Sequence, residues 1–549
     1  MKKFVIGHWV GLALLTIILI GAFLRFFNLS TLPPGIYPDE ARNGIDALHA
    51  MATGQYSVFY PANNGREGLY IDLLTIVFRI FGVSIFSLKL ISAAIGMLTI
   101  WTVYLLAKEL QRFIKSEKPM WYQEAISLVA SLFIATSFWH INFSRISFRA
   151  IFVPFLLSLA TYYTLRMLRR GSLFDTIVAG ALWALGMYTY IAFRVAPIIP
   201  AFLIGSTLLV SLAQNRDNKN IKRWIKMIAA FALSGIIVFL PLAIYFITNS
   251  GSFASRSAGI SVFSEPQPIL AFLKSLGAHL QMFFYQGDGN WRHNISGQAQ
   301  LLFPIALLFL LGTYVVIHDA FHGLRTRQWE KAIGMLAIGM WFDALLLPAI
   351  LTIEGIPHAL RSIGVIPVTY LIAAIGFAHF LGYLLRQNIS WIRSGGFALA
   401  IALLVALPLT AYNQYFNVWG NNPNVPGAFS QYYTQIGYFL NALPDDTPKV
   451  VFVNSDGVLV PIEKYLAAPT NKDNTIPMSS QTTLFIQNTK SVHPQNTIYA
   501  TEKELENFIP QKGSIVIPLE PNDKAKTFLK EKFRGTGQQP GGIWFYQMP

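Results

Sequence analysis

Hydrophobic residues gather along this chain in long uninterrupted runs, and charged residues are largely confined to the segments between them. The first run, GHWVGLALLTIILIGAFL (7–24), contains no charged residue. A helix of about 18 apolar residues is long enough to cross the ~30 Å hydrocarbon core of a bilayer, and about eleven runs of roughly this length are candidate spans. They lie at residues 4–24, 84–106, 124–139, 150–166, 174–191, 195–213, 227–247, 299–317, 333–352, 362–385 and 395–412. The pattern predicts a multi-span α-helical membrane protein.

Short basic segments between the runs predict how the chain is oriented. Lys and Arg are enriched in cytoplasmic loops. Basic segments of this kind are KELQRFIKSEKP (108–119), RMLRRG (166–171), QNRDNKNIKRWIK (214–226), HGLRTRQWEK (322–331) and RQNISWIR (386–393). They place the N-terminus in the cytoplasm, and an odd number of spans places the C-terminal part outside. We expect the first run to be retained in the plasma (cytoplasmic) membrane, because no A-x-A-like cleavage site follows it.

The pattern changes after residue 412. Apolar runs become short, as in KVVFVNS (449–455), TLFIQN (483–488), TIYAT (497–501), SIVIPL (514–519) and GIWFYQM (542–548). They alternate with turn residues and with charged helical stretches such as DKAKTFLKEKF (523–533). Short strands mixed with helices predict an α/β fold. We therefore expect a transmembrane domain over 1–412 and an extracytoplasmic α/β domain over 413–549.

The net charge of +15 does not indicate nucleic-acid binding. Residues 413–549 carry 11 basic and 11 acidic side chains, and residues 1–412 carry 31 and 16. The excess thus belongs to the membrane part, where topology explains it. The chain has no cysteine, which excludes disulfides and thiolate metal sites.

Two segments on the predicted outer side are long, at about 25–83 and about 248–298. Connections without a function tend to be short, so long ones are often functional. Within the first, GLYIDLLTIVFRIFG (68–82) is apolar but interrupted by two charged residues. It predicts a helix lying at the membrane surface rather than a span.

An acidic pair, Asp39 and Glu40, stands in the first of these segments. Such a pair can be a solvated loop charge, and Asp39 can cap a short helix. Arginines also collect on the predicted outer side, against the topological bias. They are Arg42, Arg66, Arg145, Arg149, Arg194, Arg292 and Arg361. Each can pair with Asp46, Glu67, Asp288 or Glu354, or with lipid headgroups. As a set they suit a phosphate, which guanidinium groups bind through two parallel hydrogen bonds.

A carboxylate beside phosphate-binding arginines at the bilayer edge indicates a particular chemistry. A lipid-linked sugar phosphate would keep its tail in the membrane and its headgroup among these side chains. The carboxylate would accept the proton of an attacking hydroxyl, and the arginines would stabilise the departing phosphate.

The segment LRFFNLSTLPPGIYPDEARNGIDAL (24–48) resembles the first outer loop of GT-C superfamily membrane glycosyltransferases. More narrowly, it is similar to the protein O-mannosyltransferase and aminoarabinose transferase group (glycosyltransferase family 39-like). Its Asp-Glu pair implies Asp39 as catalytic base, with Glu40 beside it. Later segments that resemble the family are 65–110, SFWHINFSRISFRAIFVPF (137–155), YQGDGNWRHNISGQ (285–298) and EGIPHALRSIGVIP (354–367).

The chain also departs from the family pattern. Where many members have a basic residue followed by Pro-Pro-Leu, this chain has Arg66 followed by Glu67, Gly68 and Leu69. Arg149 stands in the region where many members carry an acid. If that acid takes part in catalysis, this chain must supply it from another position, for example Glu67. Further candidate substrate contacts are Glu67, Tyr70, His293 and His358. Some relatives use a divalent metal, which Asp39, Glu40 and Glu67 could bind, but the histidines show no metal-binding spacing.

The sequence thus favours an enzyme that transfers a hexose or pentose from a polyprenyl-phosphate donor. The acceptor would be a hydroxyl group of a protein, lipid or cell-surface glycan on the outer face of the membrane. Displacement at C1 would invert the anomeric configuration. A transporter or flippase of lipid-linked sugars is one alternative, although internal repeats typical of transporters are missing from the sequence. A non-catalytic membrane scaffold is another.

Overall fold

Helices form where the sequence is apolar. The computed structural model describes residues 2–548 apart from 216, 254–260, 456, 464, 467, 470–472, 491–496, 508–510, 534–535 and 540–541. Within these residues, nine helical segments are long and apolar enough to cross a membrane. Each is formed by one long helix, in four cases together with an adjoining short helix. The long helices are α1 (Lys2–Phe26), α4 (Ile85–Phe113), α7 (Phe152–Arg170), α9 (Ile198–Gln214), α10 (Asn218–Thr248), α13 (Phe303–Arg325), α14 (Trp329–Ile350), α15 (Ile366–Leu385) and α16 (Ser390–Tyr412). The predicted multi-span helical architecture is confirmed.

Two predicted spans differ from single straight helices. Residues 124–139 fall in α5 (Met120–Thr136) and α6 (Phe138–Ser144), which meet at a bend of 60°. Residues 174–191 fall in α8 (Leu173–Gly186), whose 14 residues reach only about 21 Å at 1.5 Å per residue. The described residues therefore hold up to ten candidate spans, fewer than the predicted eleven.

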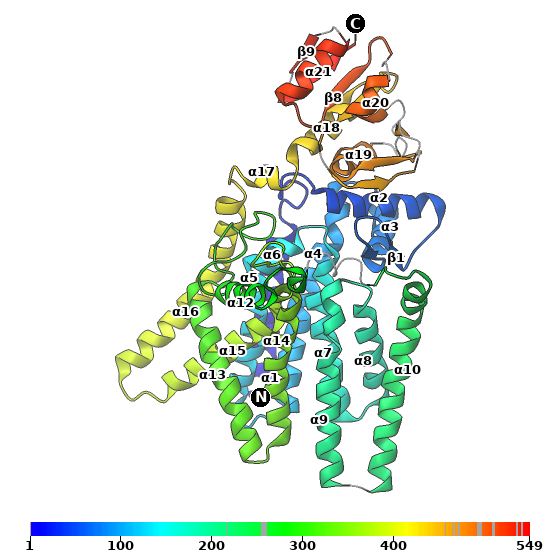
Figure 1. The fold of residues 1–549 in the computed structure, drawn as a ribbon. Helices are drawn as coiled ribbons and strands as arrows, with labels where there is room; N and C mark the ends of the chain where they lie inside the picture. Colours follow the sequence, from blue (N-terminus) through cyan, green and yellow to red (C-terminus); the bar gives the residue numbers. More distant parts are fainter. Residues whose placement is uncertain are drawn as a thin grey trace. The chain divides into compact units, whose positions relative to one another are not determined.

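The chain divides into two compact units, whose boundaries do not follow the sequence order. The first unit contains residues 1–27, 92–145 and 149–421. In it, α8 packs between α7 and α10 (Figure 1). Short helices in this unit are η1 (Arg149–Ile151), η2 (Ile191–Val195), η3 (Val262–Ser264), α12 (Pro268–Gln281), η4 (Ile363–Val365) and η5 (Asn413–Trp419).

The second unit contains residues 28–91, 146–148 and 422–549. It thus joins the first long segment to the C-terminal residues, a grouping that the linear division at residue 412 did not anticipate. Its first part holds α2 (Pro38–Thr53), a hairpin of β1 (Phe59–Tyr60) and β2 (Arg66–Glu67), and α3 (Leu69–Phe81). The predicted helix over 68–82 is therefore present as α3, and its position at a membrane surface stays a prediction.

The C-terminal residues form the predicted α/β structure. Six strands make one sheet in the order β5-β7-β3-β8-β10-β9, parallel from β5 to β8 and antiparallel at β10 and β9. The strands are β3 (Lys449–Val453), β5 (Ala468–Pro469), β7 (Thr497–Thr501), β8 (Ile515–Pro518), β9 (Thr536–Gln538) and β10 (Phe545–Gln547), with β4 (Leu459–Pro461) and β6 (Thr475–Pro477) paired separately. The helices are α17 (Val425–Ala428), α18 (Gln431–Ala442), η6 (Met478–Ser480), α19 (Gln481–Gln487), α20 (Glu502–Asn507) and α21 (Asp523–Phe533).

One apolar run of this region was assigned to the wrong element. TLFIQN (483–488) reads as a short strand but lies mostly in α19, all of whose residues are buried. A short continuous apolar run fits a buried strand and a buried helix equally well, so periodicity cannot distinguish them. Packing of α19 against α2 and α18 explains why a helix without an exposed face forms here.

Candidate functional site

The predicted site residues fall into both units, and each unit brings its own members together. The second unit holds one group: Asp39, Glu40, Arg42, Arg66, Glu67 and Tyr70. The first unit holds the other: Arg145, Arg149, Arg292, His293, His358 and Arg361.

Helix α2 positions the acidic pair. It begins at Pro38, whose fixed φ suits the first helical position, and it ends before Gly54, which adopts the left-handed φ of 72°. The residue that flanks the helix start is Tyr37. Asp39 is therefore in the first turn and is not the helix cap considered from the sequence.

Glu40 is fully buried and held by the backbone. Its Oε1 accepts a hydrogen bond from the Tyr37 N–H at 3.0 Å, and its Oε2 accepts one from the Ser147 N–H at 2.7 Å. Burial raises the pKa of this carboxyl, while the charge of Lys89 and the two N–H donors act in the opposite direction. Both oxygens are thus engaged in fixing the start of α2.

Asp39 differs from its neighbour because its side chain is only half-buried. Its Oδ1 accepts a hydrogen bond from Nδ2 of Asn63. Asn63 and Asn64 have positive φ values of 54° and 61° in the turn between β1 and β2. Asparagine tolerates this conformation better than most residues, so the Asn-Asn-Gly turn directs Asn63 toward Asp39. The sequence indicates a turn at Asn63 and Asn64, but it does not indicate that Asn63 contacts Asp39.

Two of the predicted phosphate-binding arginines share one carboxylate. Arg42 Nη2 lies 2.6 Å from Asp46 Oδ1, and Arg66 Nη2 pairs with Asp46 Oδ2. Arg66 Nη1 also donates to Asn43 Oδ1 at 2.9 Å. Burial acts to raise the pKa of Asp46, but Arg66 and Arg42 outweigh it and hold that pKa below 3.8. The group combines two guanidinium charges with one carboxylate charge.

Ser147 connects this group and was not found from the sequence. Besides its N–H bond to Glu40, its carbonyl accepts from Asn43 Nδ2 at 3.0 Å, and its hydroxyl lies 2.8 Å from the Tyr70 hydroxyl. Tyr70 is therefore a buried part of this network. Glu67 is buried beside it in β2, paired with Phe59 of β1.

In the first unit, Arg145 is fully buried at the end of α1. Its guanidinium donates to the carbonyls of Leu24, Arg25 and Phe27 at 3.0, 2.9 and 2.7 Å. The carbonyls of Leu24 and Arg25 belong to the last turn of α1, and Phe27 directly follows it, a position where cations are favourable. Arg149 lies in η1, with its guanidinium carbon 5.4 Å from the centre of the Tyr190 ring.

The remaining predicted residues of this unit lie in two loops. Arg361 Nη2 is 2.5 Å from Glu354 Oε2, and Arg292 Nε is 3.4 Å from Asn290 Oδ1. His293 and His358 stack with ring centres 4.9 Å apart, and Nδ1 of His293 is 2.9 Å from Asp288 Oδ2. Among the described residues, this acid and the two histidines form a group with metal-ligand spacing, and Asp39, Glu40 and Glu67 do not.

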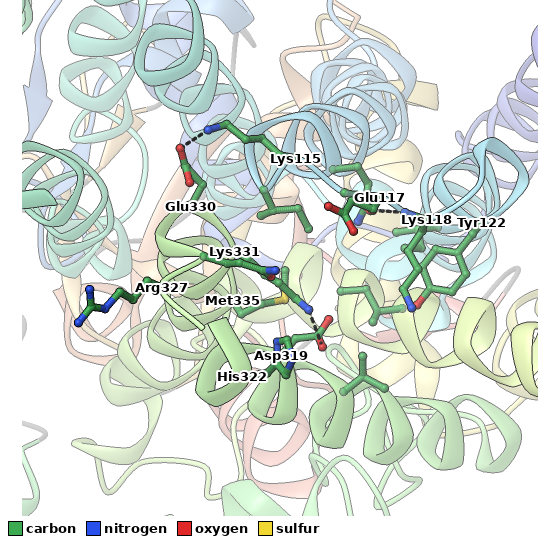
Figure 2. Close-up of a pocket in the computed structure, with 17 residues that line it drawn as sticks. Lys115, Glu117, Lys118, Tyr122, Asp319, His322, Arg327, Glu330, Lys331 and Met335 are labelled. Carbon is green, nitrogen blue, oxygen red and sulfur yellow. Dashed lines mark hydrogen bonds and ion pairs between the residues drawn. The ribbon is translucent and has the colours of Figure 1, made fainter. Parts of the chain in front are cut away.

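A cavity of about 610 Å³ lies elsewhere in the first unit and contains none of the predicted site residues. It is lined by charged residues near the ends of α4, α5, α13 and α14 (Figure 2). Lys331 pairs there with Asp319 at 3.0 Å, and Lys115 pairs with Glu330. Because these residues belong to segments predicted to face the cytoplasm, the cavity does not coincide with the predicted chemistry.

Comparison with known structures defines the class of protein. The chain resembles the crystal structure of ArnT from Cupriavidus metallidurans bound to undecaprenyl phosphate, with a TM-score of 0.53, 12% identity and 98% of each chain covered. The apo structure of the same protein gives the same TM-score and identity over 99% of this chain. The chain is thus a multi-span membrane protein with the GT-C fold.

The family comparison agrees with this fold. Residues 70–245 match the model of the family described as dolichyl-phosphate-mannose-protein mannosyltransferase. The resemblance stated from the sequence is confirmed. No curated protein matches the sequence. An archaeal oligosaccharyltransferase, AglB from Archaeoglobus fulgidus, is similar at a TM-score of 0.48 and 15% identity, over 81% of this chain. The chain spans 62% of the length of that protein.

Proposed function

We propose that the protein is a glycosyltransferase that uses a polyprenyl-phosphate-linked sugar as donor. Its acceptor is a hydroxyl group of a protein, lipid or cell-surface glycan on the outer side of the plasma membrane. The fold and the mannosyltransferase segment support the reaction class. ArnT, the similar protein of known structure, binds undecaprenyl phosphate.

The observation that carries the proposal is that two adjacent carboxylates differ in burial and in hydrogen bonding. Glu40 is fully buried, and both of its oxygens accept backbone N–H bonds. Asp39 remains half-exposed, and Asn63 orients it through one oxygen. A general base needs a fixed position and an oxygen within reach of the substrate proton. Asp39 meets both requirements, whereas Glu40 serves to position the helix that carries Asp39.

In the proposed reaction, Asp39 accepts the proton of the acceptor hydroxyl as that oxygen attacks C1 of the donor sugar. The new bond forms from C1 to the acceptor oxygen, and the bond from C1 to the phosphate oxygen breaks. The polyprenyl phosphate leaves with both electrons of that bond. Attack opposite the leaving group inverts the configuration at C1.

The arginine group is proposed to act on the phosphate. Asp39, Arg42 and Asp46 occupy positions on one face of α2, because residues three and four apart are neighbours on a helix. Asp46 holds the guanidinium groups of Arg42 and Arg66 in fixed positions. Such a preorganised charge stabilises the leaving phosphate without reorganisation during the reaction. Arg145, Arg149, Arg292 and Arg361 stay candidates for further donor contacts.

The test compares the wild-type protein with Asp39→Asn in nanodiscs. A panel of polyprenyl-phosphate hexoses and pentoses is supplied with membrane extract as acceptor, and release of polyprenyl phosphate is measured by mass spectrometry. We expect Asp39→Asn to bind donor normally and to release the product about 10²–10⁴-fold more slowly, the usual contribution of a general base.

Asp72→Asn is the matched control, because Asp72 is also half-buried and hydrogen-bonded, to the Tyr60 hydroxyl at 2.7 Å. It should retain the wild-type rate. Equal release by wild type and Asp39→Asn would exclude Asp39 as the base. If the wild type moves the intact donor across proteoliposome membranes without releasing polyprenyl phosphate, the protein is a transporter.

A further inference from the structure

Three side chains with ligating atoms converge in the first unit, away from the group around Asp39 in sequence. Nδ1 of His293 and Nδ1 of His358 lie 2.9 and 4.0 Å from Asp288 Oδ2. One ligand atom from each residue lies within 4.8 Å of the others. We propose that Asp288, His293 and His358 bind a divalent transition-metal ion of the Zn²⁺ class.

The separations suit such an ion. Zinc binds imidazole nitrogen and carboxylate oxygen at about 2.0–2.2 Å in tetrahedral geometry, which places neighbouring ligand atoms roughly 3.4 Å apart. The two observed separations, 2.9 and 4.0 Å, bracket that value. Ligand shifts of roughly half an ångström would therefore complete the geometry. Three protein ligands leave the fourth position for water or an anionic oxygen.

His358 supplies an independent observation. Nδ1 of His358 is buried and has no hydrogen-bond partner among the residues that the structure describes. Its side chain is only 12% exposed. Buried polar atoms are nearly always satisfied by a protein group, a water or an ion. A metal ion between this nitrogen and Asp288 would satisfy it.

Asp288 is already oriented by the backbone. Its Oδ1 accepts from the Asn290 N–H at 2.8 Å, and its Oδ2 accepts from the Ala359 N–H at 2.8 Å. The second bond ties the carboxylate to the loop that carries His358. Supporting hydrogen bonds of this kind fix the direction of a metal ligand before the ion arrives.

A third histidine, His279, fixes the backbone at His358 without being a metal ligand itself. Nδ1 of His279 lies 2.7 Å from the Ser275 carbonyl, which requires that this nitrogen carry the proton. Its Nε2 is then free to accept from the His358 N–H, at 3.1 Å. Both nitrogens of His279 are thus occupied, whereas the nitrogen of His358 that faces Asp288 is available.

The surrounding charges set the protonation state and limit the affinity. Burial lowers the pKa of His358 well below its usual range, and nearby His293, Arg361 and Arg292 lower it further. The neutral imidazole is the form that binds a metal. The same arginines oppose a cation, although Glu354 partly offsets Arg361.

The experiment uses the full chain, purified in detergent and treated with chelator. Zn²⁺ binding is measured by calorimetry, and Co²⁺ is used as a spectroscopic probe of tetrahedral coordination. We expect one ion per chain and at least 100-fold weaker binding in Asp288→Asn and in His358→Gln. Hydrogen exchange should show that Zn²⁺ protects residues 285–298 and 354–361.

The control is the double variant His318→Gln, His322→Gln. These two histidines also stack, at 6.0 Å, and His318 lies 3.2 Å from an Asp319 oxygen, so they offer a second place where metal could bind adventitiously. The control should retain one bound ion. The proposal is overturned if wild type binds no stoichiometric ion, or if Asp288→Asn and His358→Gln, folded by their thermal transition, bind it as wild type does.

Discussion

Asp46→Asn should loosen helix α2, because it removes the carboxylate charge that pairs with both Arg42 and Arg66. Asparagine has nearly the same shape and keeps one acceptor oxygen. The change therefore tests charge compensation rather than packing. Two guanidinium groups would remain buried without a carboxylate between them.

The expected size follows from the burial of the partners. The side chains of Arg66 and Asp46 are 1% and 7% exposed, so water screens the pair very little. Removing one partner of a buried ion pair typically costs about 3–5 kcal/mol, much of it from the uncompensated charge that remains. At about 1.4 kcal/mol for each factor of ten, 3 kcal/mol corresponds to opening of α2 that is on the order of 100-fold more frequent.

Hydrogen–deuterium exchange of peptides covering residues 38–53 measures this opening directly, since local exchange reports local stability. The control is Asp445→Asn in the same unit. Asp445 is 83% exposed and pairs with Lys490, so its loss should leave exchange in α2 unchanged.

A second variant separates charge from packing. In Asp46→Leu combined with Arg42→Met and Arg66→Met, all three buried charges of the group are replaced by apolar groups, and such replacements are often neutral. We expect the triple variant to recover much of the protection lost in Asp46→Asn. The reasoning fails if Asp46→Asn raises exchange less than threefold, or if the triple variant is less protected than the single one.

Two further predictions concern the acidic groups of the second unit. Asp46 has a lowered pKa, so the stability it adds is present above pH 3.8 and is lost as pH falls through its folded-state pKa. Glu40 has a raised pKa, so the stability it adds is present below pH 4.5 and is lost as pH rises through its folded-state pKa. In thermal unfolding, the melting temperature of the wild type relative to that of Glu40→Gln should therefore rise as pH falls from 7 toward 4.5. A difference in melting temperature that stays constant over this range would contradict the raised pKa. Asn63→Ala should lower the rate of polyprenyl-phosphate release about tenfold while leaving donor binding unchanged, because Asp39 loses its orienting donor; a change in donor binding alone would show that Asn63 contacts substrate instead.

The parts of the fold that follow from local pattern were predictable. Long apolar runs specify helices wherever they occur, and β3, β7, β8 and β10 lie within runs read as strands. The failures have physical causes. The run at 483–488 carries no periodicity that separates a buried helix from a strand, and the length of α8 depends on where the chain turns after Gly186.

The candidate site was predictable in its residue types but not in its pairings. The acidic pair and the arginines stand out because charges are rare in this sequence. Whether an arginine binds substrate, a carboxylate or a helix end depends on partners far away in the chain. Arg145 reaches carbonyls about 120 residues earlier, and Arg66 reaches Asp46, 20 residues earlier. No spacing in the sequence encodes these distances.

The same argument explains why the proposed metal ligands escaped a search by spacing. His358 lies in a different loop from Asp288 and His293, and the loops are brought together by α6. Trp139 Nε1 donates to the Ala359 carbonyl at 3.0 Å, and Asn142 Nδ2 donates to the Arg292 carbonyl at 2.6 Å. These two side chains are three positions apart on one short helix, so a single rigid element fixes the backbone beside both histidines. The short helix α6, which follows α5 at a bend of 60°, therefore supports both loops.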